Sequence, residues 1–211
     1  MNGIVLFGAG SPICADVVET CRRNGHAIVA AIRNVPGEVC VDTTVRVVEA
    51  TEVTPDLAMM PFVLPLFGPH NRRNALAAAT DLGFRNQARL VDRTAIVASD
   101  CQVAAGVFVN AGCIIAGAAT LGEFAFCNRG ANIGHHCRLG AFASIGPGAI
   151  LAGLVEVGEA SQVGAGAVIL PRVTIGVGAV VAPGAVVARD VPDNGFAVGN
   201  PARIQVRPAG S

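Results

Sequence analysis

Aliphatic residues recur at every sixth position through the second half of the chain. Steps of six from Val91 to Val187 mark 17 positions, and all but Cys127 carry Val, Ile or Leu. The fourth residue after each position is small or short, as at Ala119 and Ala143, and the first is often Gly. A period of six fits neither one long helix nor one long strand, but it is typical of a parallel β-helix.

Each six-residue unit should form a short strand and a corner, and three units should close one triangular coil of 18 residues. The aliphatic side chain fills the interior, and the small residue beside it avoids overpacking. Gly at a corner permits unusual backbone angles. The sequence therefore predicts an all-β parallel β-helix of between five and six coils. By itself, such a solenoid could also be a structural spacer stabilised by stacking.

The first ninety residues follow a different pattern. An apolar run over 3–7 ends in Gly8-Ala9-Gly10, a helical pattern covers 15–23, and a second apolar run covers 27–32. A third apolar run over 61–66 precedes a helical pattern over 71–82. Strands that alternate with helices predict a small Rossmann-like α/β unit with a parallel sheet. We expect one domain over 1–88 and the β-helix with a C-terminal tail over 89–211.

Composition excludes several classes of protein. The 15 acidic and 15 basic residues cancel, so the basic excess of a nucleic-acid surface is missing. Hydrophobic residues reach 52% and argue against disorder, while no apolar run has the length of a membrane span. The start of the chain has no basic segment of the kind that opens a signal peptide. Seven Cys without a CxxC pair suggest reduced thiols, and we expect a cytoplasmic protein with no bound metal.

The two halves together resemble the hexapeptide-repeat sugar acyltransferases, which include sialic acid O-acetyltransferases and N-acetyltransferases of nucleotide-linked amino sugars. The resemblance covers nearly the whole chain. The segments that carry it are Gly8-Ala9-Gly10, Gly68-x-x-Asn71-x-Arg73, Asn128-x-Gly130, His135-x-Cys137-x-x-Gly140 and Gly199-Asn200-Pro201-Ala202. It implies a left-handed β-helix, a homotrimer, acetyl-CoA as acyl donor between neighbouring subunits, and a sugar or nucleotide-sugar acceptor in the α/β domain.

Acyl transfer from a thioester needs a base near the acceptor and a donor for the oxyanion. Gly153 follows His135 by 18 residues, so the two should share a corner on adjacent coils, about 4.8 Å apart. The resemblance implies that His135 is the base and Gly153 the oxyanion donor, although His135 could also be a solvated corner residue. The family usually has a carboxylate after the base. Here His136 stands there, so His136 substitutes for it, a neighbouring subunit supplies a carboxylate, or activity is weak.

The acceptor pocket should involve the glycine turn and the end of the second strand. Gly8 and Gly10 could cradle a phosphate on backbone N–H groups, or could simply form a tight turn. The turn continues with Ser11 and Pro12, and Pro12 has no N–H to offer. Arg33 and Asn34 stand where the family has an acidic pair, and Arg33 could meet a phosphate or carboxylate.

Asn128 and the donor-site residues have weaker support. Asn128 matches a family residue near the acceptor, but it could equally stack on Asn110 in an Asn ladder. Ser144 stands near the expected thioester and could be a mere corner hydroxyl. The other donor-site candidates are Gly153, Ala165 and Pro183 along the pantetheine arm, and Arg189 and Arg203 at the CoA phosphates. The inward Cys127 and Cys137 should act as small hydrophobic residues.

Two other functions compete with acetyl transfer to a sugar. A zinc-dependent carbonic anhydrase uses the same helix, but it needs three His ligands, and the repeat offers only His135 and His136. The non-enzyme alternative is a catalytically weak or inactive trimeric scaffold that binds a sugar or nucleotide. Thioester cleavage would separate an enzyme from a scaffold.

Overall fold

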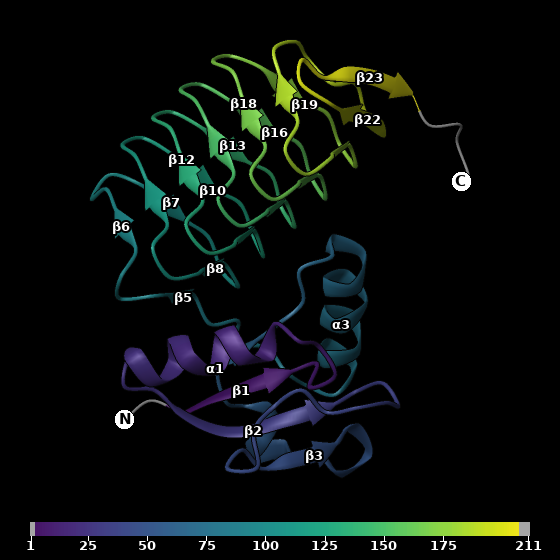
Figure 1. The fold of residues 1–211 in the computed structure, drawn as a ribbon. Coiled ribbons are helices and arrows are strands. Elements are labelled where there is room, and N and C mark those ends of the chain that lie inside the picture. The colour runs from purple at the N-terminus through teal and green to yellow at the C-terminus, as the bar shows by residue number, and fades with distance from the viewer. Residues whose placement is uncertain (1–2, 207–211) are drawn as a thin grey trace. The chain divides into compact units, whose positions relative to one another are not determined.

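The computed structural model describes residues 3–206, which form two compact units that meet between Arg93 and Thr94. This junction lies slightly later than the expected one at residue 88. Figure 1 shows the N-terminal α/β unit in purple and blue and the coils of the second unit from teal to yellow.

The N-terminal unit has a four-stranded parallel sheet in the order β3-β2-β1-β4, which confirms the predicted small parallel sheet. Its elements are β1 (Gly3–Phe7), α1 (Cys14–Arg23), β2 (Ala27–Arg33), β3 (Val47–Glu49), a 3-10 turn (Ala50–Glu52), α2 (Pro55–Ala58), β4 (Phe62–Val63) and α3 (Pro69–Asp81). The pattern analysis missed β3 and α2, because three and four residues are too short to show a period.

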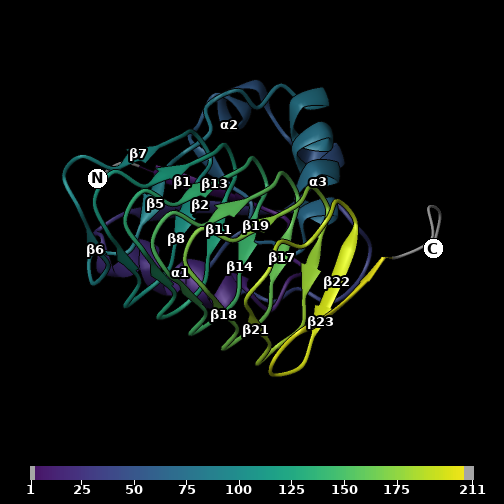
Figure 2. The same cartoon turned by 90° about the horizontal axis from the view of Figure 1, so that it is seen from above.

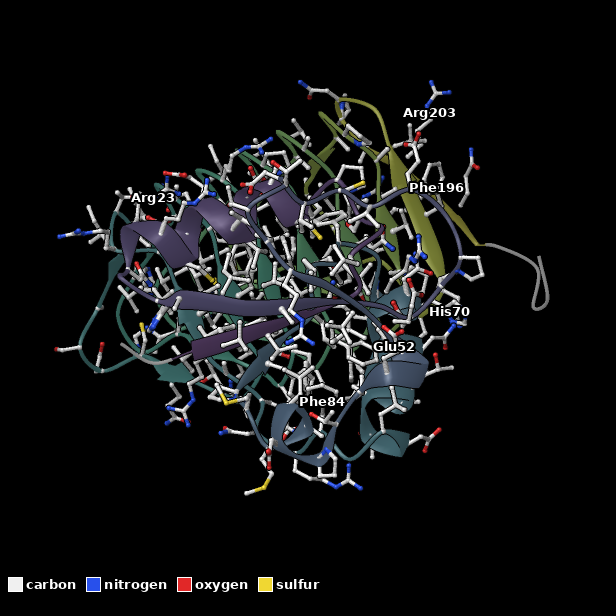
Figure 3. The ribbon with its side chains drawn as sticks, turned by 90° about the horizontal axis from the view of Figure 1, so that it is seen from below. Arg23, Glu52, His70, Phe84, Phe196 and Arg203 are labelled. Carbon is white, nitrogen blue, oxygen red and sulfur yellow. The ribbon has the colours of Figure 1, made fainter. Side chains whose placement is uncertain are left out.

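The core of this unit is built from apolar strands and three Phe rings. Phe84, labelled in Figure 3, packs edge-on against Phe7 and Phe62 at centroid distances of 5.4 Å each. Helix α1 buries Val17 and Cys21 on its inner face. The buried Asp92 carboxylate ties the end of the unit to α1, because it accepts hydrogen bonds from Thr20 Oγ1 and from the Arg23 guanidinium.

The second unit is the predicted β-helix. Every one of the 17 positions in the six-residue series is the second residue of a two-residue strand. Partner strands are offset by 18 residues, as in Thr120↔Arg138, so one coil consists of three six-residue units. Figure 2 shows the strands of successive coils lying side by side.

Three parallel sheets form the faces of this prism. The first face contains β6 (Ile96–Val97), β9 (Ile114–Ile115), β12 (Asn132–Ile133), β15 (Ile150–Leu151), β18 (Val168–Ile169) and β21 (Val186–Val187). The second contains β7 (Gln102–Val103), β10 (Thr120–Leu121), β13 (Arg138–Leu139), β16 (Glu156–Val157) and β19 (Thr174–Ile175). The third includes β8 (Phe108–Val109), β11 (Phe126–Cys127), β14 (Ser144–Ile145), β17 (Gln162–Val163), β20 (Val180–Val181), β22 (Gly195–Val198) and β23 (Arg203–Val206). Strand β5 (Leu90–Val91) precedes the junction, and β22 and β23 form an antiparallel pair.

The Gly that directly follows many of the aliphatic residues was expected to allow unusual backbone angles at a corner, but the structure shows a different reason for it. Gly134, Gly146 and Gly158 have no left-handed φ; instead, a Cβ on any of them would lie about 2.6 Å from backbone atoms of the next coil. The left-handed corner position comes two residues later, and Gly, Phe124 and His136 all occupy it. Close stacking of the coils therefore accounts for Gly134, Gly146 and Gly158, whereas the left-handed position accepts Gly and other residues.

Candidate functional site

A cavity of about 650 Å³ opens at the carboxyl ends of β1 and β2 in the N-terminal unit. Its walls are the turn after β1, the loop after β2, Leu66, and one face of α3; the lining residues are Gly8, Gly10, Ser11, Pro12, Asn34–Glu38, Asn71, Asn74, Ala75 and Ala78. The chain moves from β1 to β2 on one side and returns to β4 on the other. Ligands of open parallel sheets bind at such a switch point.

The first two N–H groups of the turn after β1 form hydrogen bonds within the N-terminal unit and are not available to a ligand. Gly8 and Ala9 both donate to the Ile32 carbonyl, at 3.1 and 3.0 Å, which confirms the tight-turn alternative for this part. Gly8 needs its freedom because its φ is +116°. Within residues 3–206, the N–H groups of Gly10 and Ser11 have no acceptor, so these two N–H groups of the turn remain available to a ligand in the cavity.

The structure brings Gly8, Gly10, Ser11 and Asn34 together, as expected, but not Arg33. The Arg33 guanidinium forms an ion pair with Glu49 and does not line the cavity. As a substrate contact, Arg33 stays a prediction.

Sequence reasoning missed the helical wall of the cavity. The residues of this wall are spaced three, one and three positions apart, which puts them on one face of helix α3: Asn71, Asn74, Ala75 and Ala78. This polar and small face could have been read from the predicted helix. Of the lining residues, Glu38 alone carries a formal charge.

His135 and Gly153 share one corner of the β-helix, as the 18-residue spacing predicts. Leu154 N donates to the His135 carbonyl at 2.9 Å, and the imidazole covers the Gly153 Cα: a Cβ built on Gly153 would lie 2.4 Å from His135 Nε2. His135 is exposed. Within the described residues, the Gly153 N–H has no acceptor. A proton acceptor and an N–H donor therefore lie side by side at the surface.

His136 lies against His135. The two Nδ1 atoms are 3.1 Å apart, and the rings are nearly perpendicular. His136 has a left-handed φ of 58° and donates its N–H to the Gly117 carbonyl at 2.9 Å. The repeat therefore fixes the backbone of this corner, and the two histidine side chains meet on it.

Asn128 stacks on Asn110 as the ladder alternative predicts. Asn110 Nδ2 donates to Asn128 Oδ1 at 2.9 Å, and both side chains are buried. Ser144 is not a corner hydroxyl, which corrects that alternative: it is the first residue of β14 and pairs with Phe126 and Gln162. Contact of Asn128 with an acceptor and of Ser144 with CoA stay predictions.

The predicted donor-site residues occupy two different corners within one chain. Gly153 follows β15 of the first face, whereas Ala165 follows β17 and Pro183 follows β20 of the third face. Ala165 and Pro183 are exposed and stacked, since Gly184 N donates to the Ala165 carbonyl. One face of six residues, at about 3.3 Å per residue, separates two corners by up to about 20 Å. Gly153 is therefore separated from Ala165 and Pro183 within one chain, and contact of all three residues with CoA stays a prediction.

All seven cysteines are free thiols; five are buried, and Cys40 and Cys101 are partly exposed. Cys127 and Cys137 point into the β-helix, as predicted, and burial raises the pKa of Cys137. Residues 3–206 contain no group of three or more His, Cys, Asp or Glu that could hold a metal. No helix in this range is long and apolar enough to cross a membrane.

No protein-family model matches the chain, and no curated protein matches it either. Perosamine N-acetyltransferase from Caulobacter crescentus, solved with CoA and GDP-perosamine, superposes with a TM-score of 0.88 at 31% identity over 98% of both chains. Structures of that protein include variants with one histidine replaced by asparagine or by alanine.

Two further solved structures are similar over almost the whole chain. The acetyltransferase domain of PglB from Neisseria gonorrhoeae, solved with acetyl coenzyme A, has a TM-score of 0.84 at 26% identity, covering 96% of this chain and 99% of that one. WeeI from Acinetobacter baumannii, at 20% identity and a TM-score of 0.74, shares the fold.

Proposed function

Because the chain belongs to the hexapeptide-repeat sugar acetyltransferases, with their left-handed β-helix, we propose that it moves the acetyl group of acetyl-CoA to an amino group of a nucleotide-linked sugar. The observation that carries this proposal is the full-length similarity to an N-acetyltransferase solved with CoA and GDP-perosamine. In this proposal the cavity at the sheet edge holds the acceptor, and the His135–Gly153 corner carries the reacting groups.

The residues at the corner support a direct transfer. His135 Nε2 accepts a proton from the amine as it attacks the thioester carbonyl, and the Gly153 N–H donates to the oxyanion that forms. Gly153 lacks a side chain, which leaves room for the His135 imidazole to lie against its Cα, beside the N–H that would meet the oxyanion. The proton then goes to the departing CoA sulfur, which balances the reaction to an amide and a free thiol.

The nucleotide part would occupy the cavity of the N-terminal unit. Gly10 and Ser11 offer N–H groups, and Asn34, Asn71 and Asn74 offer side-chain amides. Glu38 can accept from N–H groups of a base or hydroxyls of a ribose. These neutral and acidic groups suit an uncharged base and sugar better than a polyanion held by cations.

The donor would bind between two copies of the chain. The Ala165–Pro183 corner and the His135–Gly153 corner are apart in one prism, so a neighbour's corner must complete the site. The first face presents Ile96, Ile114 and Ile150, which are 65%, 41% and 45% exposed, a row of apolar side chains that a partner would bury. We therefore include a homotrimer in the proposal, because cyclic symmetry closes such a repeated contact.

A product assay tests the proposed function. The protein is incubated with acetyl-CoA and a panel of GDP- and UDP-linked amino and hydroxy sugars that begins with GDP-perosamine. We expect free CoA and a product heavier by one acetyl group that resists alkaline hydroxylamine, since amides survive it and esters do not. An ester product would overturn amine transfer, and no thiol release with any sugar would favour the inactive scaffold. His135→Ala is the control for background hydrolysis.

Light scattering tests the trimer against the 21.3 kDa mass of one chain. Ile114→Arg should dissociate it, while Gln102→Arg on the second face should not. A single-chain mass for the unaltered protein contradicts the shared donor site. The free thiols support a reducing compartment, and the cytoplasm is our proposed location.

A further inference from the structure

The corner that carries the proposed base also carries a second imidazole with a specific contact. We propose that His136 is a positioning residue: it accepts a hydrogen bond from His135 Nδ1–H, which stabilises the base-competent tautomer of His135, and it shares the proton that His135 takes up. This inference rests on the proposed function, and it assigns to a neutral side chain the part that a carboxylate plays beside a catalytic histidine elsewhere.

The contact itself shows which atoms are involved. His135 Nδ1 and His136 Nδ1 are 3.1 Å apart, which is hydrogen-bond distance for one N–H and one lone pair. The other edge of the His135 ring, with Nε2, lies over Gly153. His135 therefore has one nitrogen toward His136 and the other toward the place of reaction.

A neutral imidazole has one donor and one acceptor, so the pair has two arrangements. If His135 Nδ1–H donates to His136 Nδ1, then His135 Nε2 keeps its lone pair and can act as base. If His136 donates instead, His135 Nε2 carries a proton and cannot. A carboxylate only accepts and would enforce the first arrangement; His136 permits it when its own Nε2 holds the proton.

The shared hydrogen bond also gives the proton a path. The amine proton bonds to His135 Nε2, and the Nδ1 proton moves to His136 Nδ1, so the positive charge leaves the reacting centre for an exposed ring. When the CoA sulfur leaves, Nε2 returns its proton to the thiolate and Nδ1 retakes its own. No proton is lost or gained, and the pair ends as it began.

The charged groups around this corner do not replace His136. Asp100 lies two coils below, where its carboxylate faces Gly117, and Arg172 occupies the same corner two coils above. The adjacent corners carry Gly117 with Ala118 and Gly153 with Leu154, which are uncharged. On the neighbouring face, Arg138 and Glu156 are paired in register on β13 and β16. Among the described residues, the hydrogen-bond partner of His135 Nδ1 is His136.

The fold supplies well-matched variants for the left-handed position. Phe124 and Phe142 occupy the equivalent corner site at φ 55° and 59°, so His136→Phe keeps the backbone and removes the hydrogen bond. His136→Asn keeps a neutral acceptor, and His136→Asp adds a charged one; both residues tolerate this conformation. His135→Ala tests the proposed function separately.

Kinetics with GDP-perosamine, or with the acceptor found in the panel, measure the effect. His136→Phe should lower kcat about 10- to 100-fold with little change in KM, a part of the 100- to 10,000-fold that general-base catalysis supplies. His136→Asn should stay within a few-fold of the parent. His136→Asp should keep kcat at least at the level of the parent protein. It should also move the acid limb of the kcat/KM profile to higher pH, because a carboxylate stabilises the His135 imidazolium.

Imidazole ¹⁵N spectra of the histidine-labelled protein give a readout that does not depend on activity. The chain has only four His, so variants assign each one. We expect a protonated Nδ1 on His135 and an unprotonated Nδ1 on His136, with the His135 tautomer lost in His136→Phe. If His136→Phe leaves kcat, pH profile and His135 tautomer unchanged, the inference is overturned. If His135→Ala is also fully active, the proposed base falls with it.

Discussion

Gly153→Ala should disable the proposed site without unfolding the protein. The added Cβ would lie 2.4 Å from His135 Nε2 and 2.5 Å from Cε1, whereas carbon atoms in contact prefer about 3.5–4.0 Å. The imidazole must therefore move by about 1 Å or more. Because the clashing atoms belong to an exposed side chain and the φ of Gly153 is not left-handed, the ring can swing aside.

The cost should appear in catalysis and not in folding. A displacement of about 1 Å in a catalytic group costs about 100-fold, so kcat should fall by that factor. The free energy of unfolding should change by less than about 1 kcal/mol, as for a surface substitution. Thiol release from acetyl-CoA gives kcat, and urea denaturation gives the stability of the same samples.

Gly117→Ala is the matched control, because Gly117 occupies the same corner position one coil below His135. The nearest atoms to a Cβ there belong to the Asp100 carboxylate, with its oxygens at 3.4 and 3.5 Å, which is ordinary contact distance, so kcat should not change. In the His135→Ala background, Gly153→Ala should lower kcat only a few-fold further, since its effect acts through the imidazole. The reasoning is refuted if Gly153→Ala alone keeps kcat within about twofold, or if the two substitutions act with full independent effects.

Three further outcomes are expected. Ala78→Phe should fill the cavity of the N-terminal unit and raise KM for the nucleotide-sugar at least tenfold, with KM for acetyl-CoA unchanged. The control Ala77→Phe lies at an exposed position outside the cavity and should alter neither KM. If both variants raise KM for the nucleotide-sugar equally, the cavity is not the nucleotide site. Burial raises the pKa of the Cys21 thiol from 9.0 to about 12. The contribution of Cys21 to the free energy of unfolding should therefore be fully present below pH 9 and fall by on the order of 4 kcal/mol toward pH 12. A Cys21→Ala variant whose urea midpoint declines as steeply over this pH range as that of the parent would refute this. Asp92→Asn should lower the free energy of unfolding by about 2 kcal/mol, because the buried carboxylate accepts hydrogen bonds from the Arg23 guanidinium and from Thr20. Urea denaturation that shows a loss of less than about 0.5 kcal/mol would contradict this.

The repeat, and much of the site, could be predicted from the sequence. The six-residue series places an aliphatic side chain inward in each unit, so a one-dimensional count located each two-residue strand from Val91 to Val187. It did not locate β22 and β23, which follow the series. The same count placed Gly153 beside His135, because the stacking of identical coils converts an interval of 18 residues into one strand spacing. Such contacts are local in the repeat and need no knowledge of the rest of the fold.

Other features required the tertiary structure. Arg33 meets Glu49 only because β2 and β3 pair, and β3 is too short to show a pattern. The distance between the two imidazoles at His135 and His136 depends on a left-handed corner that composition does not reveal. In the periodic half of the chain, the position of a residue in the sequence determines which residue of the next coil it stacks on. The backbone angles at the corners and the pairing of short strands such as β3 determine the other side-chain contacts, and these only the tertiary structure shows.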